Sequence, residues 1–552
     1  MFGYLWRASW QTIIWVLVIG ITSGLSSAAL IATINKALSE RAGDNSLLWQ
    51  FSGLCAVVLL AETLSFYWTN RLSEASIYKL RIKISQLILS SPYPNLQKLG
   101  KAKLLANLTT DIATISQAFM LLPEICVHGA VVTGCMAYLA WLSWQMALVL
   151  TGIILFAVIT YRIFTRSPQQ ALVRAREAYD NLNQGFRHLT EGIKELKLHS
   201  DRSKDFMERG LAASAETNRS LALSANVGFM LANKYTFLIY YLAIGLILFA
   251  WPWHQANPET ASGYVLVLLF MTGHLAGLTH NIPVFATARI ALDKITQLGE
   301  ILEAGLVQTH DTASAKNGAA FHSLTLRGVT HRFHREKENR SFTLGPINLD
   351  FKAGELVFLI GGNGSGKTTL AMLLMGLYHP EQGEISLNGM RISDANREAY
   401  LQNFAVVFAD FYLFDELFGF DSDKITYKLI DYLERLHLHH KLTLNQGRFS
   451  TLELSQGQCK RLALLVAYLE DRPFYIFDEW AADQDPEFKE LFYTELLPEL
   501  KAKGKTVLAI THDDRYFHLA DRCIKLEEGQ IKSIEYPPVA PQAQPIAEIG
   551  VC

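Results

Sequence analysis

Four short motifs in the second half of the chain carry residue types that bind or act on phosphate. The first is Gly361-x-x-x-x-Gly366-Lys367-Thr368, followed by Leu454-Ser-Gln-Gly-Gln458, Asp478-Glu479 and His512. A Gly-rich loop between an apolar strand and a helix turns its backbone N–H groups toward phosphate oxygens, and the positive end of the helix adds to the attraction. The first motif therefore predicts an ATP site of the P-loop kind.

The P-loop pattern gives individual residues specific roles. Lys367 is expected to contact the β- and γ-phosphates of ATP, and the Thr368 hydroxyl to bind Mg²⁺. Asp478 ends the apolar run Phe474–Phe477, where a carboxylate is expected as the second Mg²⁺ ligand. The residues predicted to hold ATP in this loop are Gly361, Asn363, Gly364, Ser365, Gly366, Lys367, Thr368 and Thr369.

Two residues beside this site are predicted to be catalytic. Glu479 is placed to polarise the attacking water as a general base. His512 follows a second apolar run, Thr506–Ile510, and is expected to contact the γ-phosphate. An isolated histidine is more often structural, but a position at a strand end favours the catalytic role. The apolar runs Phe474–Phe477 and Thr506–Ile510, together with the strand expected before the Gly-rich loop, predict an α/β domain with a central sheet.

The Ser-Gln-Gly motif predicts a second anion site. Ser455, Gln456, Gly457 and Gln458 open an expected helix over Cys459–Leu469, whose N-terminus offers hydrogen-bond donors. If this helix and the P-loop helix start from separate regions of one compact domain, one chain cannot easily bring the two sites together. We therefore expect a homodimer in which each P-loop faces the partner's Ser-Gln-Gly loop.

The composition places these motifs in an integral membrane protein. Half of the 552 residues are hydrophobic, 18% are charged, and the net charge of −2 gives no reason to expect a nucleic-acid partner. The six cysteines lie far apart without a C-x-x-C pair, which argues against a disulfide framework or a zinc site. The N-terminal apolar run has no clear cleavage site, so we expect a retained transmembrane helix.

Six apolar segments are long enough to cross a bilayer. They are approximately Ile13–Ile34, Leu48–Trp68, Phe119–Trp141, Met146–Ile163, Thr236–Trp251 and Ser262–Pro283. Lysines and arginines concentrate in the long loops after the second and fourth segments, whereas the loops near Ser143 and Pro252–Ala261 carry none. The first outer loop, with Lys36 and Arg41, fits this pattern less well. The positive-inside rule places both termini and both long loops in the cytoplasm.

The two long loops repeat apolar residues at helical spacing, so they are expected to extend the membrane helices into the cytosol. Each has a break, at Pro92-Tyr-Pro94 and around Gly192. Two interpretations stay open for these segments: a solvated amphipathic helix, or a strut that touches the nucleotide domain.

The sequence thus predicts a membrane all-α domain of six helices over residues 1–304 and an α/β P-loop nucleotide-binding domain over 321–536. A small polar linker over 305–320 joins them, and the Pro-rich residues 537–552 are expected to form a disordered tail.

Five ionisable residues within or beside the predicted spans are candidates for a transport path. Charge in hydrocarbon is costly, so such residues usually face a cavity or a partner. They are Glu62, His128, Lys234 and His274, with Glu124 near the start of the third span. An intrahelical or interfacial polar contact is the alternative, especially for Glu124 and Lys234 near the membrane edge.

Six spans ahead of one such motif set resemble an ATP-binding-cassette exporter half-transporter, of the type IV exporter kind, over nearly the whole chain. The resemblance implies that Phe333 stacks on the adenine ring and that Asp485 is the aspartate of the loop after the catalytic glutamate. This chain departs from the family at Ala409, where most cassettes have Gln. That departure puts the usual Mg²⁺ and coupling role of the loop in question.

Several stretches are similar to one branch of that family, the bacterial cyclic-peptide exporters for syringomycin-type lipopeptides, pyoverdine precursors and lasso-peptide microcins. They are Gly185–Leu198, Phe408–Phe414, Leu454–Leu465 and Asp478–Pro486. The resemblance implies ATP-driven export of a cyclic or modified peptide, or a siderophore precursor, across the bacterial cytoplasmic (inner) membrane by alternating access of a homodimer.

Two other functions stay open at this point. A lipid or glycolipid flippase can use the same frame, and its substrate would remain in the membrane. A regulatory ATPase that transports nothing is disfavoured by the intact Lys367, Asp478, Glu479 and His512 and by the complete set of spans.

Overall fold

The computed structural model describes residues 2–39, 45–250, 258–303, 320–335 and 340–537. Its internal contacts divide the chain into two units, Met1–Ser91 with Asn95–Gly305 and Pro92–Pro94 with Leu306–Cys552. Each unit is described by itself below. Residues 305–319 of the predicted linker and 538–552 of the predicted tail lie outside the described residues.

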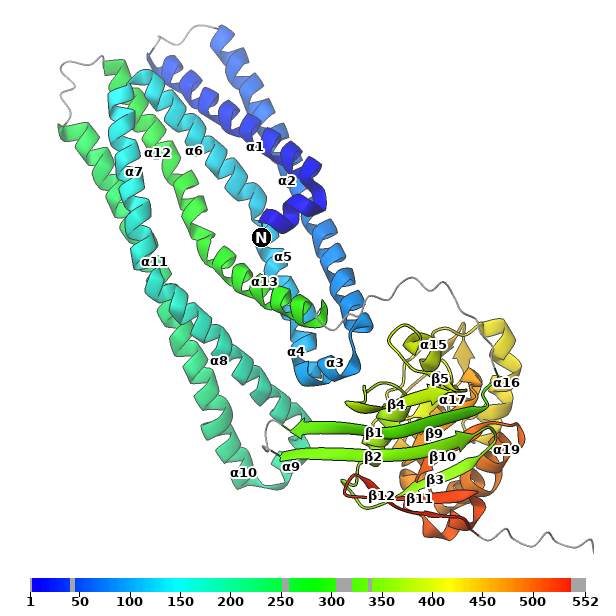
Figure 1. Cartoon of the computed structure of the whole chain (residues 1–552). Helices are drawn as coiled ribbons and strands as arrows, with labels where there is room; N and C mark the ends of the chain where they lie inside the picture. Colours follow the sequence, from blue (N-terminus) through cyan, green and yellow to red (C-terminus); the bar gives the residue numbers. More distant parts are fainter. Residues whose placement is uncertain (1, 40–44, 251–257, 304–319, 336–339, 538–552) are drawn as a thin grey trace, which may run out of the picture. The chain divides into compact units, whose positions relative to one another are not determined.

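The first unit is built from long helices (Figure 1). These are α1 (Phe2–Ser39), α2 (Asn45–Ser90), α5 (Ile112–Met120), α6 (Leu122–Leu142), α7 (Trp144–Phe164), α8 (Arg166–Glu191), α11 (Ala213–Ala250), α12 (Pro258–His280) and α13 (Ile282–Glu303). The chain also forms the short helices α3 (Tyr93–Leu99), α4 (Lys101–Ala106), α9 (Ile193–Leu198) and α10 (Ser200–Asp205). The ends of α2 and α8 confirm the two predicted helix breaks.

Six helical stretches of the described residues are long and apolar enough to cross a membrane. They are Val18–Ala37, Asn45–Ser90, Lys103–Leu142, Trp144–Phe164, Ser200–Leu246 and Gly263–Glu303. Each overlaps one predicted span, although Trp251, the end of the fifth, lies outside the described residues. Large apolar side chains such as Trp15 and Leu60 are exposed on this unit. Such side chains are compatible with lipid tails, which are as apolar as leucine.

Close approach and a few buried hydrogen bonds fix the helix packing in this unit. A Cβ at Gly24 of α1 would lie 2.4 Å from the backbone carbonyl carbon of Ala130 in α6, so a small residue is needed at this crossing. The Tyr264 hydroxyl on α12 lies 2.7 Å from both the Leu139 and Ser143 carbonyl oxygens at the end of α6. These contacts tie α1, α6 and α12 together.

The second unit contains a four-stranded antiparallel sheet and a six-stranded, mostly parallel sheet (Figure 1). The first has the order β2 (Arg340–Lys352), β1 (Ser323–Arg335), β4 (Gln382–Leu387), β5 (Met390–Arg391). The second has the order β12 (Gln530–Glu535), β11 (Arg522–Glu527), β3 (Leu356–Ile360), β10 (Thr506–Ile510), β9 (Phe474–Asp478), β6 (Phe404–Val407).

Helices and one small hairpin complete the second unit. The helices are α14 (Lys367–Leu374), α15 (Arg397–Leu401), α16 (Ser422–Arg435), α17 (Gln456–Glu470), α18 (Pro486–Leu491) and α19 (Leu497–Ala502), and the hairpin pairs β7 (Leu444–Asn445) with β8 (Arg448–Phe449).

Strand register brings the predicted motifs to one edge of the six-stranded sheet. In β10, Ile510 lies opposite Asp478 of β9 on one side and opposite Leu359 of β3 on the other, and all three strands are parallel. The segments that follow these strands therefore leave the sheet at the same edge. They are the P-loop, Glu479 and the segment that contains His512.

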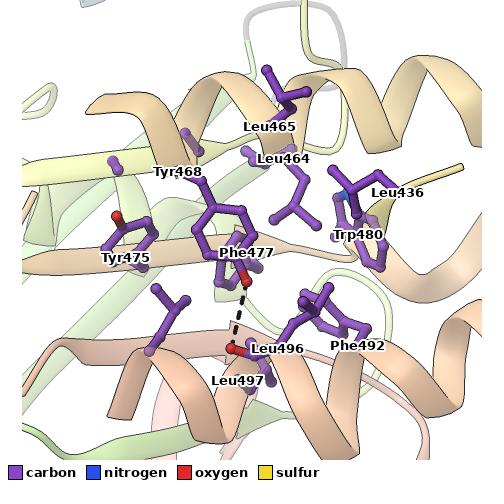
Figure 2. Close-up of a cluster of buried hydrophobic side chains, with 14 of the residues drawn as sticks. Leu436, Leu464, Leu465, Tyr468, Tyr475, Phe477, Trp480, Phe492, Leu496 and Leu497 are labelled. Carbon is purple, nitrogen blue, oxygen red and sulfur yellow. Dashed lines mark hydrogen bonds between the residues drawn. The ribbon is translucent and has the colours of Figure 1, made fainter. Parts of the chain in front are cut away.

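A core of buried aromatic and leucine side chains lies between α17, β9 and the segment Phe492–Leu497 (Figure 2). The Trp480 and Phe492 rings stack with centroids 4.3 Å apart. The Tyr468 hydroxyl donates to the Leu496 carbonyl oxygen at 3.4 Å, the dashed line in Figure 2. Because Trp480 directly follows Glu479, this core fixes the chain at the predicted catalytic residue.

Candidate nucleotide site

Two P-loop positions are packed so closely that only glycine fits. Gly366 has φ 99°, and a Cβ there would lie 2.9 Å from the Phe342 ring of β2. A Cβ at Gly361 would lie 2.2 Å from the carbonyl oxygen of Leu526 in β11. The loop is therefore packed between two strands, with Asn363 and Gly364 exposed at its tip. A Gly-rich loop of this kind can direct backbone N–H groups toward an anion.

The side chain of Lys367 lies inside this loop. Its Nζ donates to the carbonyl oxygens of Gly361 at 2.9 Å and Gly362 at 3.1 Å, and the residue is 6% exposed. Burial lowers the pKa of Lys367, and the nearby Glu479 and Asp478 carboxylates act in the opposite direction. The ammonium is therefore held against the backbone of the loop itself. Thr369 is half-buried and is the third residue of α14.

The two predicted Mg²⁺ ligands are in contact with each other. The Thr368 hydroxyl donates to Asp478 Oδ2 at 3.1 Å. Asp478 is 3% exposed, and its Oδ1 has no hydrogen-bond partner among the described residues. Burial raises the pKa of the Asp478 carboxyl, and the hydrogen bond from Thr368 acts against that rise. A hydroxyl beside a carboxylate that has a buried oxygen without a partner among the described residues is a donor set that fits a hard divalent cation such as Mg²⁺.

Glu479 and His512 meet beside this pair. His512 Nε2 lies 3.3 Å from Glu479 Oε1, and both side chains are partly exposed. Glu479 itself has φ 51°, in the left-handed region, and its N–H donates to the Ile510 carbonyl oxygen at 3.2 Å. An accessible carboxylate next to an imidazole can accept a proton from water and orient it.

The Ser-Gln-Gly loop forms the N-terminus of α17. Ser455 Oγ accepts a hydrogen bond from the Gln458 N–H at 3.3 Å, and Gln458 Oε1 accepts one from the Ser455 N–H at 3.0 Å. This reciprocal capping box satisfies the end of the helix. Ser455 and Gln456 are exposed. The loop therefore presents a capped helix N-terminus at the surface of the unit.

The residues that the family resemblance suggested have the following places. Phe333 on β1 is paired in register with Phe342, the residue whose ring lies against Gly366. Asp485 caps α18 by accepting the Phe488 N–H at 2.9 Å, and its other oxygen accepts a hydrogen bond from Arg461 Nη2 at 2.7 Å. Ala409 is exposed just beyond β6.

Sequence reasoning missed several residues that shape this site. Phe342 packs on the P-loop, and Lys460 Nζ donates a hydrogen bond to the Glu479 carbonyl oxygen. Gln484, in the segment after Glu479, donates from Nε2 to the Gly457 carbonyl oxygen of the Ser-Gln-Gly loop. Phe342 lies on β2 and belongs to none of the four phosphate motifs. Lys460 is a buried charge on a helix, 3% exposed, and nothing in its local spacing distinguishes it from a solvated lysine.

In the membrane unit the structure joins two of the predicted path residues. His128 of α6 and His274 of α12 have Nδ1 atoms 3.0 Å apart. A Cβ at Gly277 would lie 2.2 Å from the His128 ring, so the glycine leaves room for this contact. The other predicted path residues, Glu62 and Lys234, are exposed on α2 and α11. Glu124 Oε2 accepts a hydrogen bond from Asn281 at 3.4 Å.

Membrane-length helices in one unit and a Gly-rich P-loop sequence in the other are the parts expected of an ATP-driven membrane protein. The family model "ABC transporter" matches residues 344–482, and "ABC transporter transmembrane region" matches residues 11–274. The chain is 36% identical over 545 residues to the ATP-binding protein SyrD of Pseudomonas syringae pv. syringae, covering 96% of each chain. The chain belongs to the ABC transporter family as an exporter half-transporter, and it hydrolyses ATP.

Two further comparisons agree with this assignment. The ATP-dependent lipid A-core flippase of Pasteurella multocida is 25% identical over 544 residues, covering 93% of this chain and 90% of the flippase. A bacterial Atm1-family ABC exporter with ATP bound has the same fold, with a TM-score of 0.75 at 18% identity, covering 96% and 95% of the two chains. The predicted fold class is thereby confirmed.

Proposed function

We propose that this chain exports a peptide-derived small molecule across the bacterial cytoplasmic membrane. The cargo class is a cyclic or modified peptide, or a siderophore precursor. The observation that carries this proposal is the graded similarity: 36% identity to SyrD against 25% to a lipid A-core flippase, over nearly equal lengths. The higher identity to SyrD agrees with the motif sequences of the nucleotide unit, which resemble those of the peptide-exporting branch.

The working unit in this proposal is a homodimer. Each chain supplies one P-loop and one Ser-Gln-Gly loop, and Ser455 is exposed at a capped helix N-terminus. Such an end attracts anions. Two chains facing each other would therefore close each P-loop with the partner's Ser455 loop, so that two ATP molecules join the dimer. Both termini and both long loops lie in the cytoplasm in this proposal.

Hydrolysis in each site is assigned to residues of one P-loop and its neighbours. Lys367 binds the β- and γ-phosphates, while Thr368 and Asp478 would hold Mg²⁺, which when bound neutralises phosphate charge. Glu479 accepts the proton of the attacking water, and His512 holds that carboxylate at 3.3 Å. Phe333 stacks on the adenine ring. Opening and closing of this dimer would alternate access to the cargo in the membrane unit.

His128 and His274 are proposed to line the cargo path. The two imidazoles form a hydrogen-bonded polar pair between α6 and α12. The centroid of the Phe270 ring lies 4.8 Å from that of His274. Peptide cargo carries hydrogen-bond donors and acceptors that such a pair can contact. His128→Asn and His274→Asn are expected to reduce export more than they reduce ATP binding. Unchanged export by both variants would remove these residues from the path.

The cargo class is tested by comparing culture supernatants by mass spectrometry. Strains carry the intact gene, a deletion, or the deletion complemented with Glu479→Gln. A peptide-derived species present only with the intact gene supports export. A lipid or glycolipid flippase, the second candidate, is favoured by the flippase relatives and predicts that the changed species stays in the membrane fraction. No changed species in the medium, while the gene is expressed, would contradict the peptide proposal.

A further inference from the structure

Lys460 is a buried lysine that the chemistry described above does not use. It lies on α17, five residues after Ser455, and is 3% exposed. A buried ammonium is costly unless carboxylates and hydrogen-bond acceptors replace water. Here the groups that do so belong to the turn that directly follows Asp478.

Three contacts fasten Lys460 to that turn. Its Nζ lies 2.7 Å from Asp483 Oδ2 and donates to the Glu479 carbonyl oxygen at 3.0 Å. Its own carbonyl oxygen accepts a hydrogen bond from Trp480 Nε1 at 2.7 Å. Trp480 is 1% exposed in the core of Figure 2, so the helix and the turn are fixed to the same rigid cluster.

Glu479 needs such support because its backbone is in an unfavourable conformation. A φ of 51° is uncommon for a residue with a Cβ and persists only where the surroundings hold it. The Glu479 carbonyl oxygen accepts hydrogen bonds from Lys460 Nζ and from the Ala482 N–H at 3.2 Å. The Ala482 N–H belongs to the same turn as Glu479, whereas Lys460 is a side chain of the separate helix α17.

We propose that Lys460 is a positioning residue for ATP hydrolysis, which holds the Glu479 peptide so that the Glu479 carboxylate stays beside His512. Asp483 supplies the counter-charge that keeps the ammonium in place. The inference rests on the proposed role of Glu479 as general base. Gln456 Nε2 also donates to Asp483 Oδ2, at 3.2 Å, so the Ser-Gln-Gly loop is joined to the same carboxylate.

The test uses the full-length chain and measures kcat, ATP affinity and thermal unfolding for Lys460→Met. A displaced general base slows the chemical step without weakening ATP binding. We expect kcat to fall by about 10- to 100-fold, the scale of a 1 Å misplacement, with unchanged ATP affinity. Lys460→Arg, which keeps the charge, is expected to retain more activity than Lys460→Met.

Lys505→Met is the matched control. Lys505 Nζ also lies 2.7 Å from an aspartate, Asp471, but it precedes β10 at the end of the strand away from His512. Its loss is expected to lower thermal stability and leave kcat per folded molecule unchanged. Equal losses of kcat in both variants would assign Lys460 to stability alone and overturn the proposal, as would a wild-type kcat in Lys460→Met.

Asp483→Asn keeps the inference testable if Lys460→Met fails to fold. It removes the counter-charge and leaves the Glu479 carbonyl contact, so a smaller fall in kcat at wild-type ATP affinity is expected. A wild-type kcat would overturn the proposal. Glu479→Gln, measured in parallel, separates the two levels: if it remains active, the general-base assignment fails; if it is inactive while Lys460→Met and Asp483→Asn are normal, only the positioning role fails.

Discussion

The Thr368 hydroxyl lies 3.1 Å from Asp478 Oδ2, although Thr368 is in the first turn of α14, Asp478 ends β9, and the two residues are 110 positions apart. The neighbouring Oδ1 of Asp478 is buried and has no partner among the described residues. The proposed Mg²⁺ site can therefore be tested by removing one oxygen atom, the Thr368 hydroxyl.

Thr368→Val removes the hydroxyl and keeps the side-chain shape. We expect ATP hydrolysis to fall by at least about 10-fold, the scale for a weakened metal site, and to require more Mg²⁺. Hydrolysis measured over a Mg²⁺ titration checks this. Thr368→Ser restores the oxygen and should behave like the wild type. A normal Mg²⁺ dependence in Thr368→Val would remove this residue from the site.

Glu479→Gln removes the proposed base and keeps its size. Turnover should fall by about 10²-fold or more, the lower end of what general-base catalysis contributes, while ATP binding persists. Phosphate release and binding of a fluorescent ATP analogue measure the two properties. Glu490→Gln, an exposed glutamate on α18, is the control. Unchanged turnover in Glu479→Gln would end the general-base assignment.

Composite ATP sites predict rescue between two inactive chains. Lys367→Ala damages the P-loop, and Ser455→Arg damages the loop proposed to reach across the dimer. When both chains are co-expressed, a mixed dimer places both defects in one site and leaves the other site intact. ATP hydrolysis by purified mixed dimers, isolated with two different tags, should therefore exceed that of either parent. Activity no higher than the parents would show that each chain completes its own site.

Glu499 links the stability of the nucleotide unit to pH. Hydrogen bonds from Arg435, and then from Lys503, hold the pKa of Glu499 at about 2, below its ordinary 4.5. A depressed pKa gives stability that is present above the ordinary value and lost as pH falls toward 2. Glu499→Gln should lower the unfolding temperature at pH 7 by about 2–4 °C, the shift for 1 kcal/mol.

The difference between Glu499→Gln and the wild type should shrink as pH falls from 4.5 toward 2, followed by circular dichroism of the nucleotide unit. Glu495→Gln, an exposed glutamate one turn earlier, serves as the control. A gap that stays constant over this pH range would contradict the assignment.

Much of this protein could be predicted from its sequence because the signals are local. Hydropathy over one segment determines whether a helix suits a bilayer, and the six predicted spans overlap the six membrane-length helices of the described residues. The apolar run Thr506–Ile510 is a strand with those same bounds. Glycine spacing before Lys367 reflects the needs of one loop.

Other features depend on which distant surfaces pack together, and only the tertiary structure decides them. The register of β10 against β9 and β3 brings Glu479 to His512. The packing of α17 places Lys460 on the Glu479 carbonyl, and the crossing of α6 and α12 joins His128 to His274. A lysine or histidine has the same local spacing whether it is solvated or buried. Its role is fixed by the groups that replace water around it, and those come from elsewhere in the chain.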